Sequence, residues 1–316
     1  MSSKFIRKYR VVLPFVGIDV RCITGPLGPY IQYFGAHQIM KIRTLLLTVA
    51  AFVCLYFVAG GCLLRFALEP LVLPHVAPSA HTTAPLFLQI SGDDGNAMLV
   101  RRYGTPTVGC VVFFPGEHGI LAKYKKNLFP AFAAQGIAVL AVAYPGQNGA
   151  SGAHPHLSEI MPLAAQVAAA AQAACPGHQV VLYGRSLGSM VAAYAAATSH
   201  PTGLILESAA PSFSSAVRLR LKARWYLAPL ALLPISKLLP HDYSLAEALS
   251  STLGMPAVVF EGTADRETPL VDLRAAGVPG NLQLVVVPGG AHSTTYLLAR
   301  EGIIQTALSM LRARRT

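Results

Sequence analysis

Charged residues are scarce in this 316-residue sequence, and acidic ones most of all. Only 12% of the residues are charged and 53% are hydrophobic, whereas about 25% are charged in typical soluble domains. This balance excludes a disordered chain and a coiled coil, because both depend on many charged side chains. The apolar excess indicates that part of the chain lies in a membrane.

Cysteine is sparse as well, and its five positions form no recognisable pattern. No CxxC pair occurs and no spacing brings sulfur beside histidine, so neither a zinc site nor a disulfide framework is predicted. Cys110 and Cys175 are interpreted as small buried apolar side chains. His154 and His156 resemble a metal-binding pair, but no third ligand follows at a suitable spacing, and a solvated loop is preferred.

Positive charge is concentrated near the N-terminus. Residues 1–65 contain eight Lys or Arg and a single acid, Asp19. The rest of the chain contains 17 basic and 13 acidic residues, so it is nearly balanced. The net charge of +11 therefore needs no nucleic-acid-binding surface to explain it, and no nucleic-acid partner is predicted.

Residues 44–64 are 21 consecutive residues without a charge, preceded by Lys41 and Arg43 and followed by Arg65. At about 1.5 Å per residue, a helix of this length crosses the roughly 30 Å hydrocarbon core of a bilayer. The positive-inside rule places the N-terminus in the cytoplasm and everything after Arg65 across the membrane. The alternative is a buried helix of a soluble protein, which is disfavoured because such helices are rarely this long and uniformly apolar.

Met40 offers a second possible start of the chain. The residues from Met40 to Arg43 resemble the beginning of a bacterial export signal, and residues 1–39 would then precede the true start. Cys62 ends a sequence that loosely resembles a lipobox, but Ala59 stands where leucine is usual, so an uncleaved anchor is preferred over a lipoprotein. Both interpretations predict an exported body that stays tethered, and the anchor places it at the bacterial inner membrane on the periplasmic, extracytoplasmic side.

Four segments follow from these patterns: an N-terminal segment at 1–43, a transmembrane helix or signal anchor at 44–64, a proline-rich extended linker at 65–85, and a folded domain at 86–316. Within the domain, strands are predicted at 86–90, 97–103, 108–114, 137–143, 179–183, 203–207, 256–261 and 282–287. Helices are predicted at 121–134, 158–174, 187–198, 245–251, 268–276 and 294–312. Several strands are apolar on both faces, so the fold class is α/β with a mostly parallel, doubly wound sheet.

The strongest chemical signal is the sequence Gly-Arg-Ser-Leu-Gly at 184–188, which lies between a predicted strand and a helix of small residues. Gly184 and Gly188 leave room for a sharp strand-to-helix turn that exposes the hydroxyl of Ser186. A serine becomes a strong nucleophile only when a histidine takes its proton and a carboxylate orients that histidine.

Asp265 and His292 each follow a later predicted strand. Because the carboxyl ends of parallel strands share one edge of a sheet, both side chains are expected to meet Ser186 there. The alternative base is His118, and the alternative carboxylates are Glu207 and Asp242.

These motifs resemble the α/β-hydrolase superfamily over roughly residues 86–312, and in particular its membrane-anchored serine hydrolases with one N-terminal span. The matching sequences are FFPGEHG at 113–119, AYPGQNGASG at 143–152, YGRSLGS at 183–189, LILES at 204–208, VFEGTADRETP at 259–269 and GGAHS at 289–293. One departure is the early loop, which commonly reads His-Gly-Asn in such relatives and here reads Pro115-Gly116-Glu117.

The resemblance implies an α/β-hydrolase fold and hydrolysis of carboxylic, thio- or lipid acyl esters through an acyl-enzyme, with no metal and no cofactor. The backbone amides of Leu187 and Glu117 are the candidate donors of the oxyanion hole. Alternatives on the same residues are a serine peptidase or an acyltransferase, and a noncatalytic tethered binding module is a further alternative.

An insert at about 209–244 is longer than a simple crossover needs and is expected to form a helical cap over the site. It contains four basic residues and the only tryptophan of the chain, namely Arg218, Arg220, Lys222, Arg224 and Trp225. One hypothesis is that this segment touches anionic lipid headgroups beside the anchor. A solvated cap surface is the default interpretation.

Overall fold

The computed structural model describes residues 8–13, 18–25, 28–31, 36–77, 84–92, 95–152, 155–175, 177, 179–252, 254–277 and 282–313. The chain divides into two compact units, Met1–Gly60 and Gly61–Thr316. His154, half of the suggested metal pair, lies outside the described residues.

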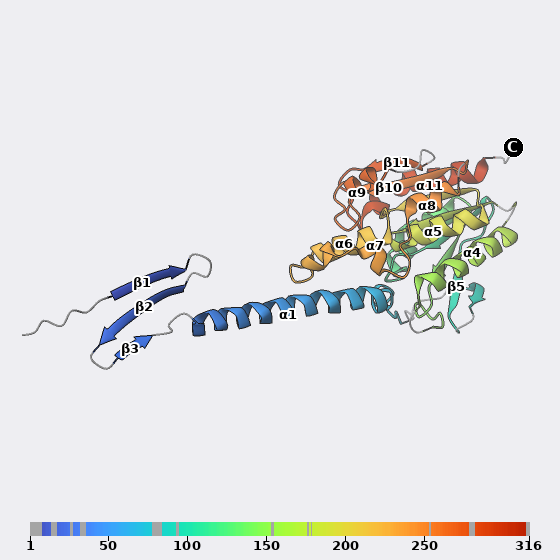
Figure 1. Ribbon diagram of the computed structural model, residues 1–316. Coiled ribbons are helices and arrows are strands. Elements are labelled where there is room, and N and C mark those ends of the chain that lie inside the picture. Colours follow the sequence, from blue (N-terminus) through green and yellow to red (C-terminus); the bar gives the residue numbers. More distant parts are fainter. Residues whose placement is uncertain are drawn as a thin grey trace, which may run out of the picture. The chain divides into compact units, whose positions relative to one another are not determined.

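The first unit begins with three antiparallel strands, β1 (Lys8–Leu13), β2 (Ile18–Gly25) and β3 (Gly28–Ile31). The sequence analysis did not predict them. The helix α1 (Ala36–Phe66) follows and contains the whole uncharged run (Figure 1). Among the described residues, Met40–Phe66 is the one stretch of helix that is long and apolar enough to cross a membrane. α1 is therefore a candidate membrane span by length and composition.

The second unit begins with the last six residues of α1, and residues 68–72 do not form the extended linker predicted at 65–85. A short helix, α2 (Leu68–Val72), comes directly after α1, and Val76 then forms a parallel bridge with Gln147. Pro70 does not prevent this helix because it occupies the first turn, where no backbone N–H donor is required.

Glu69 of α2 is buried, and its carboxylate accepts the backbone N–H of Leu157 at the start of the helix α4 (Leu157–Ala174). The Nδ1 of His156 lies 3.0 Å from the same carboxylate oxygen. His156 therefore pairs with Glu69 and caps α4, which is a structural role. Among the described residues, no group of three or more His, Cys, Asp or Glu could hold a metal ion.

An eight-stranded sheet is the centre of the second unit (Figure 1). Its spatial order is β11, β10, β9, β8, β6, β7, β5, β4. The bounds are β4 (Leu86–Ser91), β5 (Ala97–Tyr103), β6 (Gly109–Phe114), β7 (Ile137–Ala143), β8 (Val180–Arg185), β9 (Gly203–Glu207), β10 (Ala257–Gly262) and β11 (Leu282–Val287). The pairs from β7 to β11 are parallel, and β5 is antiparallel to both of its neighbours. The prediction of a mostly parallel α/β sheet is confirmed.

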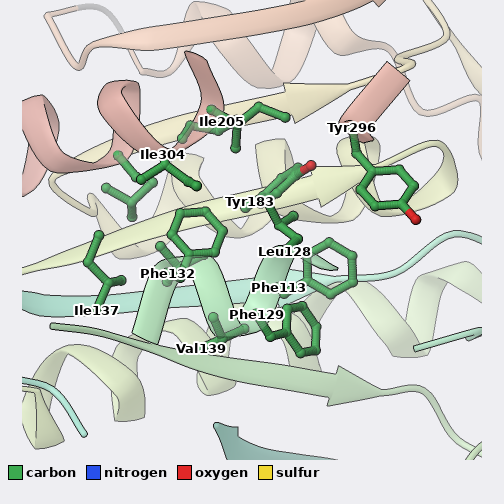
Figure 2. Close-up of a cluster of buried hydrophobic side chains, with 14 of the residues drawn as sticks. Phe113, Leu128, Phe129, Phe132, Ile137, Val139, Tyr183, Ile205, Tyr296 and Ile304 are labelled. Atoms are coloured by element: carbon green, nitrogen blue, oxygen red, sulfur yellow. The ribbon is translucent and has the colours of Figure 1, made fainter. Parts of the chain in front are cut away.

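Helices cover both faces of this sheet. One face packs against α3 (Ala122–Ala134) and α11 (Arg300–Arg312), and the other against α4 and α5 (Leu187–Ser199). Figure 2 shows the aromatic core between the sheet and α3, in which Phe113 and Tyr183 of the strands meet Phe129 and Phe132 of the helix. Because β6, β7 and β8 are buried on both faces, they need continuous apolar sequence, which is the pattern used to predict them.

The remaining helices are α8 (Leu245–Ser250), α9 (Leu270–Ala275) and α10 (Thr295–Leu298). The predicted helix at 294–312 is divided at Ala299, which ends α10 and precedes α11. The insert between β9 and β10 is helical, as expected, with α6 (Phe213–Lys222), a 3₁₀ helix η2 (Ala228–Leu232) and α7 (Ile235–Leu238).

The interpretation of Cys110 and Cys175 as plain buried side chains is wrong, because the two form a disulfide. Cys110 lies on β6, and Cys175 directly follows α4, which packs against the sheet. They are 65 residues apart in sequence, and spacing alone cannot identify such a pair. The bond links the centre of the sheet to the end of its neighbouring helix.

Candidate functional site

The candidate site lies where the sheet changes its winding direction. The chain runs from β6 outward to its neighbour β7 and then returns to β8 on the other side of β6. Loops that follow β6 and β8 diverge at such a point and leave a crevice at the carboxyl edge of the sheet. The loop after β6 carries Glu117, and the turn after β8 carries Ser186.

Ser186 occupies a sharp turn between β8 and α5. Its backbone φ of 54° lies in the left-handed region that non-glycine residues rarely adopt. A Cβ atom at Gly184 would come within 2.1 Å of the carbonyl oxygen of Gly188, and one at Gly188 within 2.1 Å of the carbonyl oxygen of Phe114. Both positions therefore require glycine, and the strained turn holds the serine hydroxyl at the crevice.

The three predicted side chains are close enough to form a continuous row of hydrogen bonds. Ser186 Oγ is 3.0 Å from His292 Nε2, and His292 Nδ1 is 2.9 Å from Asp265 Oδ2. The loops after β10 and β11 are joined by backbone hydrogen bonds from Thr263 and Ala264. These bonds bring Asp265 and His292 together although 27 residues separate them in the sequence. This arrangement can transfer a proton from serine to histidine while the carboxylate fixes the imidazole.

Asp265 is buried, and its carboxylate accepts several hydrogen bonds. One carboxylate oxygen accepts the backbone N–H groups of Glu267 and Thr268, both at 2.9 Å, and the other accepts the hydroxyl of Thr268. Burial alone would raise the pKa of Asp265. The hydrogen bond and charge of His292, together with the two amides, outweigh burial and lower this pKa to about 2. Asp265 is therefore ionised over the physiological range.

The alternative residues have other partners. Glu207 is fully buried, where its carboxylate accepts the hydroxyl of Tyr183 and the backbone N–H of Tyr296. Asp242 accepts both the N–H and the hydroxyl of Ser214 in the cap. His118 lies 3.1 Å from the carboxylate of Glu117.

Arg185 is a site residue that the sequence analysis missed. Its guanidinium donates to the backbone carbonyl of His292 and lies 3.9 Å from the buried carboxylate of Glu207. It therefore connects the strand before Ser186 to the loop that carries His292. No pattern could have identified it, because the second position of the Gly-x-Ser-x-Gly motif accepts any residue.

The two predicted oxyanion-hole residues flank Ser186. Leu187 is the first residue of α5, and Gly116, directly before Glu117, packs against Ser186, since a Cβ built on it would lie 3.4 Å from that of the serine. The carboxylate of Glu117 forms an ion pair with Arg220 of α6. Its charge is thereby balanced by the cap, and its backbone carbonyl is fixed by the side chain of Gln147 at 2.6 Å.

Two cavities adjoin Ser186 and His292. The smaller, of about 180 Å³, is lined mainly by residues with polar or charged side chains, among them Lys123, Arg185 and Glu267. The larger, of about 890 Å³, lies under the cap and is lined mainly by apolar side chains. This volume is near the upper end of the roughly 300–1,000 Å³ typical of small-molecule sites.

Comparisons with known proteins agree with this architecture. Residues 105–252 match the family model described as serine aminopeptidase, S33. No curated protein matches the chain. The Pyrococcus furiosus esterase Pf2001 is similar in structure, with a TM-score of 0.57 and 16% identity over 76% of this chain and 95% of that one. DcsB in complex with its substrate analogue has a TM-score of 0.55 and 16% identity over 73% of this chain and 98% of the other.

The sheet order, the serine turn after β8 and the match of residues 105–252 agree on one assignment. The chain has the α/β-hydrolase fold, and its residues 105–252 are similar to the serine aminopeptidase, S33 family.

Proposed function

We propose that the protein hydrolyses carboxylic acyl esters, with Ser186 as nucleophile, His292 as general base and Asp265 as the residue that orients the imidazole. The observation that carries this proposal is the pair of hydrogen-bonding distances, 3.0 Å and 2.9 Å, that join the three side chains. The strained turn supports it, because glycine is required on both sides of Ser186 and the turn holds the serine hydroxyl beside His292.

In this mechanism the Ser186 oxygen attacks the ester carbonyl while His292 Nε2 takes the hydroxyl proton. The backbone amides of Leu187 and Glu117 stabilise the negative oxygen of the tetrahedral intermediate. His292 then gives the proton to the departing alcohol, which leaves an acyl-serine. Water, deprotonated by the same nitrogen, cleaves the acyl-serine and releases the carboxylic acid.

The two cavities suggest how a substrate lies. The larger, mainly apolar cavity fits the acyl group, and the smaller polar cavity with Lys123 and Glu267 fits the alcohol. We assign esters rather than peptides because the larger cavity is lined mainly by apolar side chains, and two of its charged residues, Glu117 and Arg220, are paired with each other.

The test is hydrolysis of p-nitrophenyl esters of increasing chain length by the full-length protein and by Ser186→Ala. The alanine variant is expected to lose about 10⁶-fold in kcat, with an unchanged free energy of unfolding. Ser309→Ala, an exposed serine on α11, is the matched control and should retain full activity. Failure of a fluorophosphonate probe to label the folded protein would favour a noncatalytic binding module.

Parallel assays separate the alternative reactions. Faster cleavage of an alanine p-nitroanilide than of any ester would identify a peptidase. Transfer of the acyl group to an added alcohol in preference to water would identify an acyltransferase. Both results would retain the role proposed for Ser186 and would change only the substrate class.

We further propose that the body lies on the extracytoplasmic side of the membrane. The excess of Lys and Arg before the candidate span supports this orientation. The Cys110–Cys175 disulfide supports it independently, because disulfides persist in oxidising compartments and are rare in the cytosol. Digestion of the body by protease added to intact spheroplasts is the expected result, and protection would reverse the assigned orientation.

A further inference from the structure

One wall of the larger cavity comes from the end of the candidate membrane span. Leu63 and Leu64 of α1 line it, followed by Leu68 and Val72 of α2. Leu63 and Leu64 are also the last two residues of the uncharged run at 44–64. Leu64 is only 1% exposed, so its side chain is packed against the folded body. The chain that leaves the membrane is therefore part of the cavity beside Ser186.

Another part of the lining belongs to the cap. Val217 and Leu221 of α6 and Leu230 of η2 line it, and the polar end is formed by Ser186 and His292. A cavity with apolar walls and a nucleophile at one end fits a hydrocarbon chain whose ester carbonyl reaches the serine.

The cap carries the features of a membrane-facing surface next to this cavity. Trp225 is 87% exposed and Leu232 is 82% exposed. Lys222 and Arg224 are exposed as well, and Arg224 also lines the cavity. Tryptophan is enriched at the interface between membrane and water, and cations beside it attract anionic headgroups. Arg218 and Arg220 do not contribute, because they bind the carbonyl of Ala231 and the carboxylate of Glu117.

We propose that the larger cavity is filled from the bilayer, and that the substrate is a long-chain acyl ester of a lipid resident in the membrane that holds α1. Its acyl chain passes between the end of α1 and the cap, with the headgroup beside Lys222 and Arg224. This inference rests on the proposed esterase function. The reaction balances as ester plus water giving fatty acid plus alcohol, with the proton relayed by His292.

The test uses full-length protein reconstituted in phosphatidylcholine vesicles with 4-methylumbelliferyl oleate as the probe. The ester is placed either in the same vesicles as the enzyme or in separate vesicles without enzyme. We expect at least tenfold faster release of methylumbelliferone when enzyme and ester share a bilayer. Equal rates would overturn the proposal, because the ester would then arrive through water.

A second measurement tests the wall itself. In Leu64→Trp the larger indole is expected to fill part of the cavity that we assign to the acyl chain. Each buried methylene is worth about a fourfold change in affinity, so exclusion of two or more should lower the ratio of oleate to acetate hydrolysis by about tenfold or more. Leu55→Trp is the matched control in the same helix, because Leu55 is 62% exposed and does not line the cavity. Its ratio should equal that of the unaltered protein.

The outcomes separate the two proposals. An unchanged ratio in Leu64→Trp, with acetate still hydrolysed, would overturn the bilayer pathway and leave the esterase function intact. Absence of hydrolysis of every ester by the unaltered protein, with no fluorophosphonate labelling, would overturn the esterase function itself.

Discussion

Replacement of Asp265 by asparagine should inactivate the enzyme through the position of one proton. The oxygen Oδ1 accepts two backbone N–H groups, from Glu267 and Thr268. In Asp265→Asn the amide oxygen must occupy this position, because the NH₂ group cannot accept those bonds. The NH₂ group then replaces Oδ2 and faces His292 Nδ1, which is 2.9 Å from Oδ2 in the unaltered protein.

His292 Nδ1 is closer to this NH₂ position, at 2.9 Å, than to the Oδ1 position, at 3.2 Å, so we expect Nδ1 to accept a hydrogen bond and its proton to move to Nε2. A protonated Nε2 cannot take the proton of Ser186, 3.0 Å away. The expected loss in kcat is about 10⁴-fold, equivalent to about 5 kcal/mol of transition-state stabilisation.

The assay is steady-state hydrolysis of a p-nitrophenyl ester, with kcat and KM determined separately. Asp272→Asn provides a matched control, because Asp272 is an exposed aspartate in the same segment of the chain. A folded Asp265→Asn variant that keeps more than a tenth of the original kcat would refute the assignment of Asp265 as the residue that orients His292.

Two further predictions concern stability. Replacement of both Cys110 and Cys175 by alanine should lower the free energy of unfolding by roughly 4 kcal/mol, because the bond closes a loop between residues 65 positions apart. Urea denaturation measures this free energy. Cys54→Ala, at an exposed free cysteine, is the control and should leave the free energy of unfolding unchanged. Burial and the nearby Asp265 raise the pKa of Glu261 to about 9, so its protonated form stabilises the fold below about pH 4.5 and this contribution is lost as pH rises toward 9. Glu261→Gln should therefore match the unaltered protein at pH 4 and exceed it by roughly 2 kcal/mol or more at pH 8, and equal stabilities at pH 8 would contradict the assigned ionisation.

Much of the sheet could be predicted because its central strands, such as β6, β7, β9 and β10, are buried on both faces and form continuous apolar runs. The bounds of β5, β7, β9 and β11 agree with the predicted ranges to the residue. Asp265 and His292 could be predicted because parallel strands place the residues that follow them at one edge of the sheet.

Other elements could not be predicted because their causes are tertiary. Residues 68–72 were expected to be extended because the stretch 66–85 contains four prolines, but buried Glu69 bonds to the start of α4 and stabilises a helix there. The disulfide depends on β6 and the end of α4 lying side by side, which no spacing of cysteines reveals. The partners of Glu117 and Arg185 likewise come from elements distant in sequence.

The backbone angle of Ser186 lowers the stability of the fold at the residue that the proposed reaction needs most. A left-handed conformation costs a non-glycine residue about 1–3 kcal/mol, and Ser186→Gly would relieve that cost while it removed the nucleophile. A search for heat-tolerant variants of this protein would therefore favour dead enzyme at position 186 unless turnover were part of the selection.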